Sequence, residues 1–362
     1  MKRLLIVYNP RSSRFDDVKR EVFPKTRQLK GYVTGKYEIK PTNIEQNITE
    51  LAKIVQDGDL IISAGGDATG VISANAIIKS RKDATLAVLP YGNFNDLART
   101  LGTMRLEDVF GGKASEGLPE GSFGGCCQTA VGAEQTKSLL FVSRRRPADD
   151  PKGRERKSAS PVKTGASDSV PEGSPSMLFP LKIIVDGKFF RYATCYVTIG
   201  MTAEAVKLYD SKKMRRKLKH SFGRKIISYT AIASWYFKNR HKHQFIPSFT
   251  LNKHPESAKT SDYFAINGRS IAHVMRGGED YLSPKTFRSE TYRLTGFFRL
   301  AKMMLRSMFH RIPSSETAGD ILEFSAPATI TIQAEGESQQ FTNIHKIEIK
   351  KTTKYLKVIT LN

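Results

Sequence analysis

The feature that most constrains the fold is a regular alternation of short apolar runs and helical segments through the first hundred residues. Each apolar run has the length of one buried strand, and the segments between them carry charges or apolar side chains at helical spacing. Strands are expected at Leu4–Tyr8, Lys36–Lys40, Leu60–Ser63 and Thr85–Leu89, and helices at Arg14–Leu29, Asn43–Val55, Ala68–Lys79 and Asn95–Leu101. This alternation predicts a parallel, doubly wound α/β sheet, which we assign to residues 1–118.

Polar segments follow three of these strands. They are Asn9–Arg14, Gly65–Thr69 and Tyr91–Asp96. Ligands of doubly wound sheets bind beyond the carboxyl ends of the strands. We therefore expect the three segments to lie together along one edge of the sheet.

The rest of the chain reads mainly as antiparallel β structure. A hairpin is expected from Leu181–Val185, the turn Asp186-Gly187 and Phe189–Ile199. Further strands are expected at Phe245–Leu251, Tyr263–Asn267, Ile321–Phe324, Thr329–Ala334, His345–Lys350 and Leu356–Leu361, with inserted helices at Met214–Phe237 and Thr291–His310. This pattern predicts a β-rich second domain over 119–350 and a terminal strand within 351–362 that is a candidate to return to the first domain.

A stretch rich in Pro, Ser, Gly and basic residues interrupts this second domain at 144–176. Large apolar residues almost vanish there, which is typical of a flexible insertion. Its basic half, Arg144 to Lys163, is either a solvated loop or a contact with lipid or nucleic acid.

The charge balance points to an anionic partner. Lys and Arg number 58 against 35 Asp and Glu, which gives a formal net charge of +23. Nucleic acid, an anionic membrane surface and a phosphate-rich substrate all fit this excess. Three cysteines are too few for a disulfide framework, and no apolar run reaches the length of a spanning helix, so a cytoplasmic protein is expected.

The segment Ala64–Gly70 joins an expected strand to an expected helix through two glycines. Glycines let the backbone approach a phosphate, and the amides at a helix start favour its negative charge. The Thr69 hydroxyl could add a contact, and the Asp67 carboxylate could hold a ribose, a loop or a metal-bound water. A tight turn capped by Asp67 explains the same residues.

A second motif, Leu89–Arg99, reads Leu-Pro-Tyr-Gly-Asn-Phe-Asn-Asp-Leu-Ala-Arg. Together with Ala64–Gly70 and the Asn9-Pro10 turn, it resembles the catalytic domain of the diacylglycerol kinase family, which includes bacterial lipid kinases and sphingosine kinases. The related NAD kinases share the Gly-Gly-Asp turn but lack a segment like Asn95-Asp96. The resemblance is dense over residues 1–102 and sparse beyond, and it implies a β-sandwich-like second domain.

The resemblance implies ATP and Mg²⁺ as cofactors and a lipid hydroxyl as acceptor. It makes Asp67, Asp96 and Glu335 the catalytic residues, Asn9, Arg14, Gly65, Gly66, Thr69, Gly92 and Asn95 the nucleotide-binding residues, and Asp186 and Glu337 the metal-binding residues. Family members carry an Asp-Gly-Glu motif whose Asp is the general base. Here Glu335-Gly336-Glu337 stands in that place. A hairpin turn with exposed glutamates explains these residues too, and a hairpin-turn Asp explains Asp186 equally well.

Four residues depart from the family pattern: Ala68 and Ser13 each replace Gly, Asn93 replaces Thr and Glu335 replaces Asp. A methyl group at position 68 would be costly if the backbone there needed a positive φ. The departures leave open a catalytically weak or silent lipid- or nucleotide-binding regulatory protein on the same fold.

Basic residues gather beside apolar and aromatic ones in two places, around Lys212–Phe237 and Phe297–Arg306. This composition suits an anionic membrane surface, although packing on the β domain explains it as well. We therefore expect an ATP-dependent lipid kinase that associates peripherally with membranes. Diacylglycerol is the leading acceptor, and a sphingoid base or another long-chain alcohol is an alternative. A homodimer is possible, no nucleic acid is expected, and a soluble nucleotide kinase is a third interpretation.

Overall fold

The computed structural model describes residues 2–110, 174–209, 246–256, 260–271, 275–293 and 314–361, with a few isolated residues between 230 and 306. The predicted helices at 214–237 and 291–310, and the two basic aromatic stretches, therefore lie almost wholly outside the described residues. So does the predicted insertion at 144–176, except for its last three residues.

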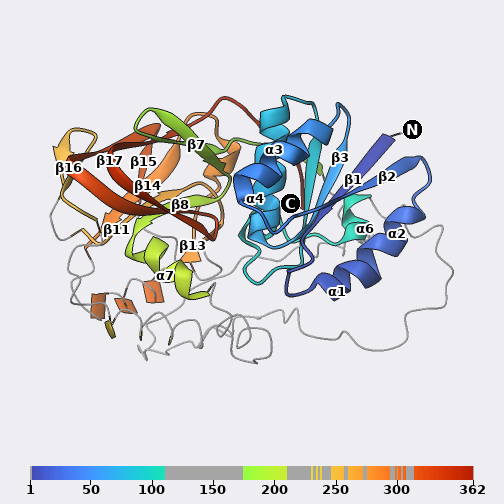
Figure 1. Ribbon diagram of the computed structural model, residues 1–362, viewed down its shortest axis with the longest axis horizontal. Helices are drawn as coiled ribbons and strands as arrows, with labels where there is room; N and C mark the ends of the chain where they lie inside the picture. Colours follow the sequence, from blue (N-terminus) through green and yellow to red (C-terminus); the bar gives the residue numbers. More distant parts are fainter. Residues whose placement is uncertain are drawn as a thin grey trace, which may run out of the picture. The chain divides into compact units, whose positions relative to one another are not determined.

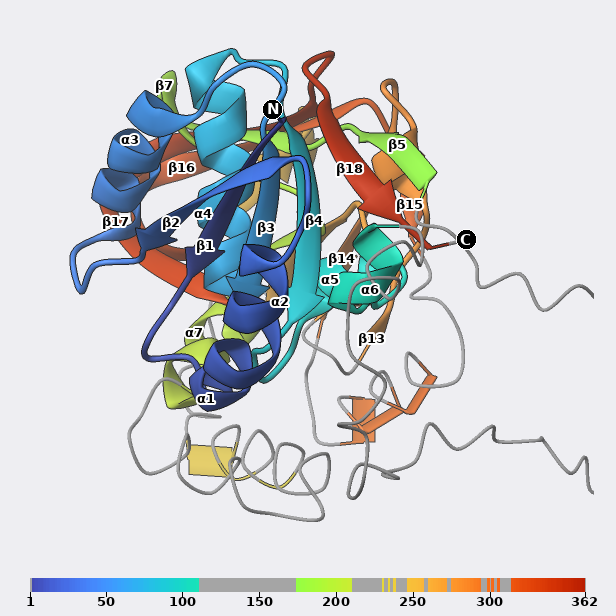
Figure 2. The same cartoon turned by 90° about the vertical axis from the view of Figure 1, so that its right-hand side faces the viewer.

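The first sheet has six strands in the order β2-β1-β3-β4-β18-β5 (Figure 2). Their bounds are β1 Lys2–Tyr8, β2 Tyr32–Glu38, β3 Leu60–Gly65, β4 Thr85–Pro90, β5 Ser174–Leu178 and β18 Leu356–Thr360. The neighbouring pairs β2–β1, β1–β3 and β3–β4 are parallel. Strand β18 pairs in parallel with β4, and β5 pairs antiparallel with β18. Strands β1, β3 and β4 are buried because helices pack against them, as the apolar runs predict.

The helices of this part are α1 Phe15–Asp17, η1 Val18–Val22, α2 Phe23–Arg27, α3 Ile44–Ile54, α4 Asp67–Ser80, α5 Asp96–Thr100 and α6 Leu106–Val109. The predicted helix at 14–29 is one continuous helical run from Phe15 to Arg27, in which η1 is a π-helical turn between α1 and α2. Pro24 lies in the first turn of α2 and cannot donate a backbone hydrogen bond to the preceding turn, which therefore widens. The Asn43 side chain caps α3 by accepting from Gln46 N at 2.7 Å.

The second sheet has ten antiparallel strands, which confirms the predicted combination of α/β and all-β parts (Figure 1). Eight follow the order β15-β14-β11-β8-β16-β17-β6-β7, and β9 and β10 attach beside β16. The bounds are β6 Leu181–Val185, β7 Lys188–Ala193, β8 Tyr196–Gly200, β9 Phe249–Leu251, β10 His254–Pro255, β11 Asp262–Ile266, β14 Phe287–Tyr292, β15 Ser315–Thr317, β16 Gly319–Ala334 and β17 Glu337–Lys351. The short pair β12 Ser270–Ile271 and β13 Met275–Arg276, helix α7 Met201–Tyr209 and the 3₁₀ turn η2 Asp280–Leu282 complete the described elements.

Strand β16 has different neighbours along its length. It pairs with β17 throughout, while its first half also pairs with β9 and its last residues also pair with β8. Irregular pairing with β17 between Glu323 and Ile330 lets the strand bend between these partners. The two separate predictions Ile321–Phe324 and Thr329–Ala334 are therefore one strand. Apolar side chains of β6, β8, β11, β16 and β17 form the second core.

The predicted strand Phe189–Ile199 is interrupted at Thr194 and Cys195, which separate β7 from β8. Both residues are fully buried, and the Cys195 carbonyl accepts hydrogen bonds from Asn267 N and Gly268 N, each at 2.7 Å. These contacts replace strand pairing at the break. The periodic pattern of the sequence did not reveal it because the flanking residues have strand character on both sides.

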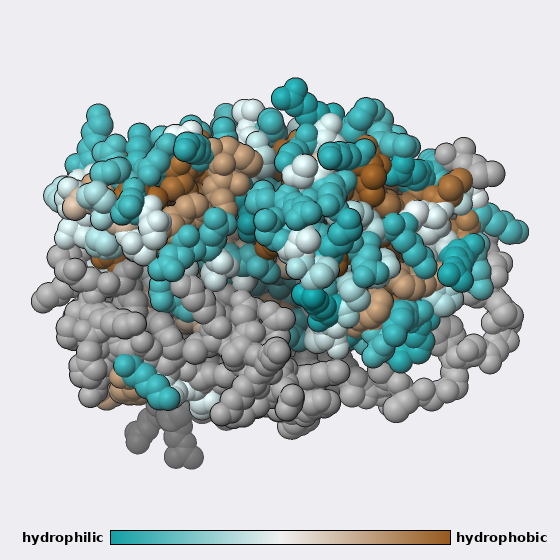
Figure 3. Space-filling model, viewed as in Figure 1, coloured by the Kyte–Doolittle hydropathy of each residue, from teal (hydrophilic) through white to brown (hydrophobic). Residues whose placement is uncertain are grey.

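The chain crosses between the two sheets through β5 and β18. The Ser176 and Thr360 hydroxyls are 2.9 Å apart across this pair, so the end of the predicted insertion is a strand. The carbonyl of Pro180 also accepts from Thr352 N at 3.3 Å, where the two connections leave the first sheet. No helix among the described residues has both the length and the apolar character needed to cross a membrane. The face seen in Figure 3 is mainly hydrophilic where it is described, with its apolar areas separated.

Candidate functional site

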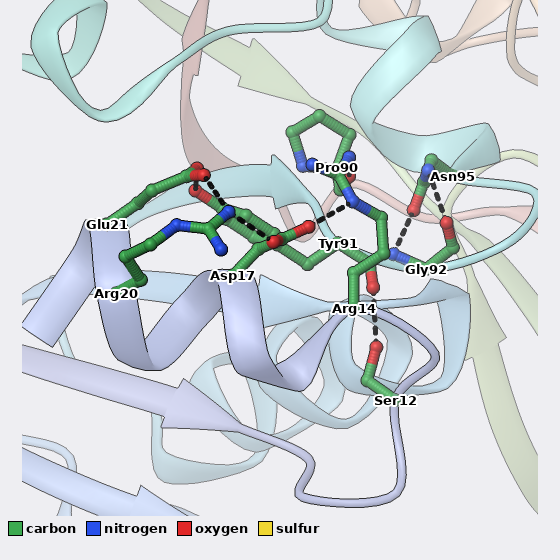
Figure 4. Close-up of polar contacts among 9 residues, drawn as sticks. All are labelled: Ser12, Arg14, Asp17, Arg20, Glu21, Pro90, Tyr91, Gly92 and Asn95. Carbon is green, nitrogen blue, oxygen red and sulfur yellow. Dashed lines mark hydrogen bonds and ion pairs between the residues drawn. The ribbon is translucent and has the colours of Figure 1, made fainter. Parts of the chain in front are cut away.

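The three polar segments do meet at the carboxyl edge of β1, β3 and β4, as predicted. Ser12 Oγ donates to the Tyr91 carbonyl at 2.5 Å, and Tyr91 N donates to the Gly65 carbonyl at 3.0 Å. Arg14 reaches the Pro90 carbonyl at 3.3 Å and pairs with Asp17 at 2.7 Å (Figure 4). The first segment is therefore bonded to the third, and the third to the second.

Two glycines at this edge are required by close backbone contact. A Cβ built on Gly92 would lie 2.2 Å from Gly66 Cα, a distance that real Cβ atoms do not reach. The turn after β3 and the turn after β4 are thus packed backbone against backbone. This contact accounts for Gly66 and Gly92 without a ligand, and their predicted contact with nucleotide stays a prediction.

The Asp67 carboxylate holds the turn that precedes α5. Its two oxygens accept from Asn95 N at 3.0 Å and Asp96 N at 2.6 Å. Asn95 has a left-handed backbone, with φ of 57°, and its side-chain oxygen accepts from Gly92 N at 2.8 Å. The interpretation of Asp67 as the cap of α4 is wrong. Gly66 is the N-cap residue, and no side-chain hydrogen bond caps the start of this helix. Ala68 lies within α4 and is not among the positive-φ residues, so its methyl group causes no backbone strain.

The Asp96 side chain is hydrogen-bonded to Tyr196 of β8 and to Ser270 of the short strand β12. Ser270 Oγ donates to its Oδ1 at 2.6 Å, and Tyr196 Oη donates to its Oδ2 at 3.2 Å. Asp96 and Tyr196 are each 1% exposed. Buried polar groups of this kind need their hydrogen bonds, so the contacts fix the position of the Asp96 carboxylate.

Glu335 occupies the turn between β16 and β17, which confirms the hairpin expectation, but its side chain is buried and not exposed. Its backbone φ is 51° and that of Gly336 is 86°, as in a turn of the type that favours Asn-Gly. Thr194 Oγ1 donates to Glu335 Oε1 at 2.5 Å, and Cys195 N donates to the same oxygen. The other oxygen, Oε2, is buried and has no hydrogen-bond partner among the described residues.

The three predicted catalytic residues, Asp67, Asp96 and Glu335, act on one another electrostatically. Burial raises the pKa of Glu335 to about 7, with a contribution from Asp96, while Thr194 and Cys195 oppose the rise. Enclosure also raises the pKa of Asp67 well above its usual value, and the charges of Asp96 and Glu335 add to the effect. Carboxyl groups crowded in this way favour a proton or a cation between them.

The remaining predicted nucleotide residues line the same edge. Thr69 Oγ1 is buried close beside Gly65 and has no hydrogen-bond partner within the described part of the chain. Asn9 uses its side-chain oxygen to accept from Arg11 N at 2.9 Å, which closes the first turn. The guanidinium of Arg14 also lies 5.3 Å from the centre of the Tyr91 ring.

The structure does not bring Asp186 to this group. It lies exposed in the turn between β6 and β7, and its carboxylate accepts from His345 N at 2.9 Å and Lys346 N at 2.7 Å. His345 is ten residues beyond Glu335 in the chain, so these contacts lie about 33 Å along β17 from Glu335, given the rise of a strand. Glu337 is the first residue of β17. Among the described residues, no group of three or more His, Cys, Asp or Glu side chains is arranged to hold a metal ion.

Sequence reasoning missed the residues that support the site from the later part of the chain, namely Thr194, Cys195, Tyr196, Ser270 and Gln333. Gln333 is 1% exposed, donates to Tyr196 Oη at 3.4 Å and accepts from Thr198 Oγ1 at 2.7 Å. A polar residue within an otherwise apolar strand was the available signal, but its partners are distant in the sequence.

Residues 3–118 match the family model described as the diacylglycerol kinase catalytic domain. A diacylglycerol kinase of Bacillus subtilis (strain 168) is 39% identical over 113 residues, a match that spans 30% of this chain and only 36% of that protein. The crystal structure of a diacylglycerol kinase from Bacillus anthracis (strain Sterne) gives a TM-score of 0.57 at 13% identity, covering 99% of this chain and 97% of that chain. A second structure from that organism gives 0.56 at 14% identity, over 99% and 98%. At such identities the structural likeness shows a shared fold.

Proposed function

Since the chain belongs, through residues 3–118, to the diacylglycerol kinase catalytic-domain family, we propose that it transfers the γ-phosphate of ATP to a lipid hydroxyl. Diacylglycerol is the acceptor that we propose first, because it is the one named for the relative from Bacillus subtilis. A sphingoid base is the second, since both acceptors offer a hydroxyl beside an apolar chain.

One observation carries most of this proposal. Asp67 and Asp96, from the family-like first part, act electrostatically on Glu335, which comes from a turn more than two hundred residues later. Glu335 has a positive φ, is buried, and has one carboxylate oxygen to which no described residue is hydrogen-bonded. A non-glycine residue in that conformation costs about 1–3 kcal/mol, and a buried carboxylate adds to the cost. Strained and buried polar residues of this kind cluster at functional sites.

On the donor side, we propose that the phosphates lie at the start of α4. Helix α4 has 14 residues, and its first amides together with the Thr69 hydroxyl offer donors to an anion. Gly65 and Gly66 permit close approach there, and Arg14 adds positive charge at the neighbouring turn. Asn95 shapes the third turn and Asn9 the first, so both act on the nucleotide through loop geometry.

Mg²⁺ fits this site as an ion held mainly by the phosphates of the nucleotide. Such ions commonly bind one or two carboxylates together with phosphates and water, so no cage of protein ligands is needed. Asp67 is the carboxylate that we propose for this contact, with its raised pKa as the supporting observation. When bound, the ion would neutralise charge that develops on the transferred phosphoryl group.

On the acceptor side, we propose that Glu335 is the general base. Its Oε1 is held by Thr194 and Cys195, which leaves Oε2 to accept the proton of the lipid hydroxyl. A pKa of about 7 suits a base that works near neutral pH. The hydroxyl oxygen then attacks the γ-phosphorus, the bond to the bridging oxygen of ADP breaks, and Glu335 holds the proton.

Three further features remain proposals: peripheral binding to an anionic membrane surface, a cytoplasmic location and a homodimer. The net charge of +23 supports the first, because lipid bilayers that contain anionic lipids attract basic surfaces. Binding of the protein to vesicles with and without anionic lipid tests it directly.

The deciding experiment incubates the full chain with γ-labelled ATP, Mg²⁺ and vesicles that contain diacylglycerol and sphingosine. Labelled phosphatidic acid or sphingosine phosphate identifies the acceptor. The Glu335→Gln variant should lose the label, whereas Asp262→Asn, which alters a buried carboxyl outside the site, should keep it. Absence of labelled lipid with intact vesicle binding would favour the silent lipid-binding protein. Labelling of a soluble acceptor without lipid would favour a nucleotide kinase.

A further inference from the structure

The segment Thr194–Tyr196 contacts helix α5. This helix follows the turns after β3 and β4, which form the proposed nucleotide side of the site (the donor loops). Tyr196 Oη donates to Asp96 Oδ2 at 3.2 Å, at the first residue of the helix. Cys195 Sγ lies 3.4 Å from Thr100 Oγ1, at its last residue. The segment therefore touches both ends of this short helix.

The same segment also holds the Glu335 turn. Thr194 Oγ1 and Cys195 N both donate to Glu335 Oε1. Gln333 lies on β16, two residues before Glu335 in the chain, and it donates to Tyr196 Oη at 3.4 Å. Tyr196 is thus hydrogen-bonded to the donor side through Asp96 and to the strand of the base through Gln333.

These contacts join parts of the site that are far apart in the sequence. Phosphoryl transfer depends on placing the attacking hydroxyl in line with the phosphate, and an error of about 1 Å can cost 10²-fold in rate. Tyr196 is suited to this task because its ring is 1% exposed and packed, so its hydroxyl has a fixed position.

We propose that Tyr196 is a positioning residue that sets the distance between the donor loops and the general base Glu335. The inference rests on the proposed kinase activity and adds a residue to it. Tyr196 touches neither reactant in this role. It acts through Asp96 on one side and through Gln333 and the Glu335 turn on the other.

The test compares Tyr196→Phe with Tyr263→Phe in the full chain. Tyr263 is also fully buried on this sheet, and its hydroxyl donates to Asp320 at 2.8 Å, near the opposite end of β16 from Glu335. Both variants remove one buried hydroxyl from a carboxylate, so their effects on folding are matched. We expect Tyr196→Phe to lower kcat at least about 10-fold with a KM for ATP within about 3-fold of the original, and Tyr263→Phe to leave both unchanged.

A second comparison separates positioning from general damage. If Tyr196 acts through the base, adding Tyr196→Phe to Glu335→Gln should lower kcat no further, because the group that it positions is already lost. Ser270→Ala removes the other donor to Asp96 without altering a buried ring and should also lower kcat.

The outcomes are distinguishable. No lipid phosphorylation by the unaltered protein overturns the proposed function and this inference with it. An active protein whose kcat is equally insensitive to Tyr196→Phe and Tyr263→Phe overturns the inference alone. Additive losses in the double variant also overturn it, because they show that Tyr196 acts independently of the base. A selective loss that disappears in the Glu335→Gln background supports it.

Discussion

Replacing Glu335 with Gln should make the protein more stable and less active at the same time. The substitution keeps the shape and an oxygen that can accept from Thr194 and Cys195, but removes the charge. The pKa of Glu335 is about 7 in the folded protein against a usual value of 4.5. Its folded pKa is raised, so the stability that it contributes is present below pH 4.5 and is lost as the pH rises through 7.

The magnitude follows from the difference between these two values. A shift of about 2.5 units at 1.36 kcal/mol per unit corresponds to about 3 kcal/mol. The unfolding free energy of Glu335→Gln relative to the original protein should therefore rise by about this amount between pH 4.5 and pH 8. Loss of the base should lower kcat by about 10²- to 10⁴-fold.

Asp262→Asn is the matched control. Asp262 is fully buried, its pKa is raised to about 7, and Oδ2 has no hydrogen-bond partner among the described residues. Its Oδ1 accepts from Thr202 N at 2.6 Å, at the start of α7. Asp262→Asn should show the same pH-dependent gain in stability without the loss of kcat.

The assay is urea unfolding at a series of pH values from 4.5 to 8, with phosphate transfer measured on the same preparations. A stability difference between Glu335→Gln and the original protein that does not change with pH would refute the reasoning, because Glu335 would then have the same pKa in both states. Equal loss of kcat in both variants would show that the charge of Glu335 has no special part in the reaction.

Three other predictions follow from single contacts. Gly92→Ala should destabilise the protein by about 1–3 kcal/mol and weaken nucleotide binding, because the new Cβ would meet the Gly66 backbone. The control Gly35→Ala, whose Cβ would have no contact under 3.4 Å, should have little effect in thermal unfolding. Burial lowers the pKa of Lys351 from 10.5 to about 7, so the unfolded chain binds more protons between these values and stability should rise with pH across them. Urea unfolding at pH 7 to 10 would show this slope, and Lys351→Met would abolish it. Thr69→Val should leave stability equal or higher, since no described residue is hydrogen-bonded to the hydroxyl, and should weaken nucleotide binding in a fluorescence titration about 3- to 10-fold.

Much of the first part could be predicted from the sequence because its signals are local. Buried parallel strands appear as continuous apolar runs, and the turns that follow them carry Gly, Asn and Asp. The edge that gathers Asn9–Arg14, Gly65–Thr69 and Tyr91–Asp96 follows from strand direction alone. The π-helical turn within the predicted helix at 14–29 was missed because a charged surface pattern does not reveal how a single Pro24 disturbs the preceding turn.

The sequence by itself determined the α/β pattern, the three turns at one edge and the candidates Asp67, Asp96 and Glu335. Only the tertiary structure decided that Glu335 is buried near Asp67 and Asp96, and that Thr194 and Cys195 interrupt a strand and donate hydrogen bonds to it. It also decided that Asp186 lies in the turn between β6 and β7, away from this site, where it accepts from the backbone of β17. The reason is that burial, pKa and hydrogen-bond partners depend on residues far apart in the chain, and no local pattern of side chains encodes which distant strand will lie beside them.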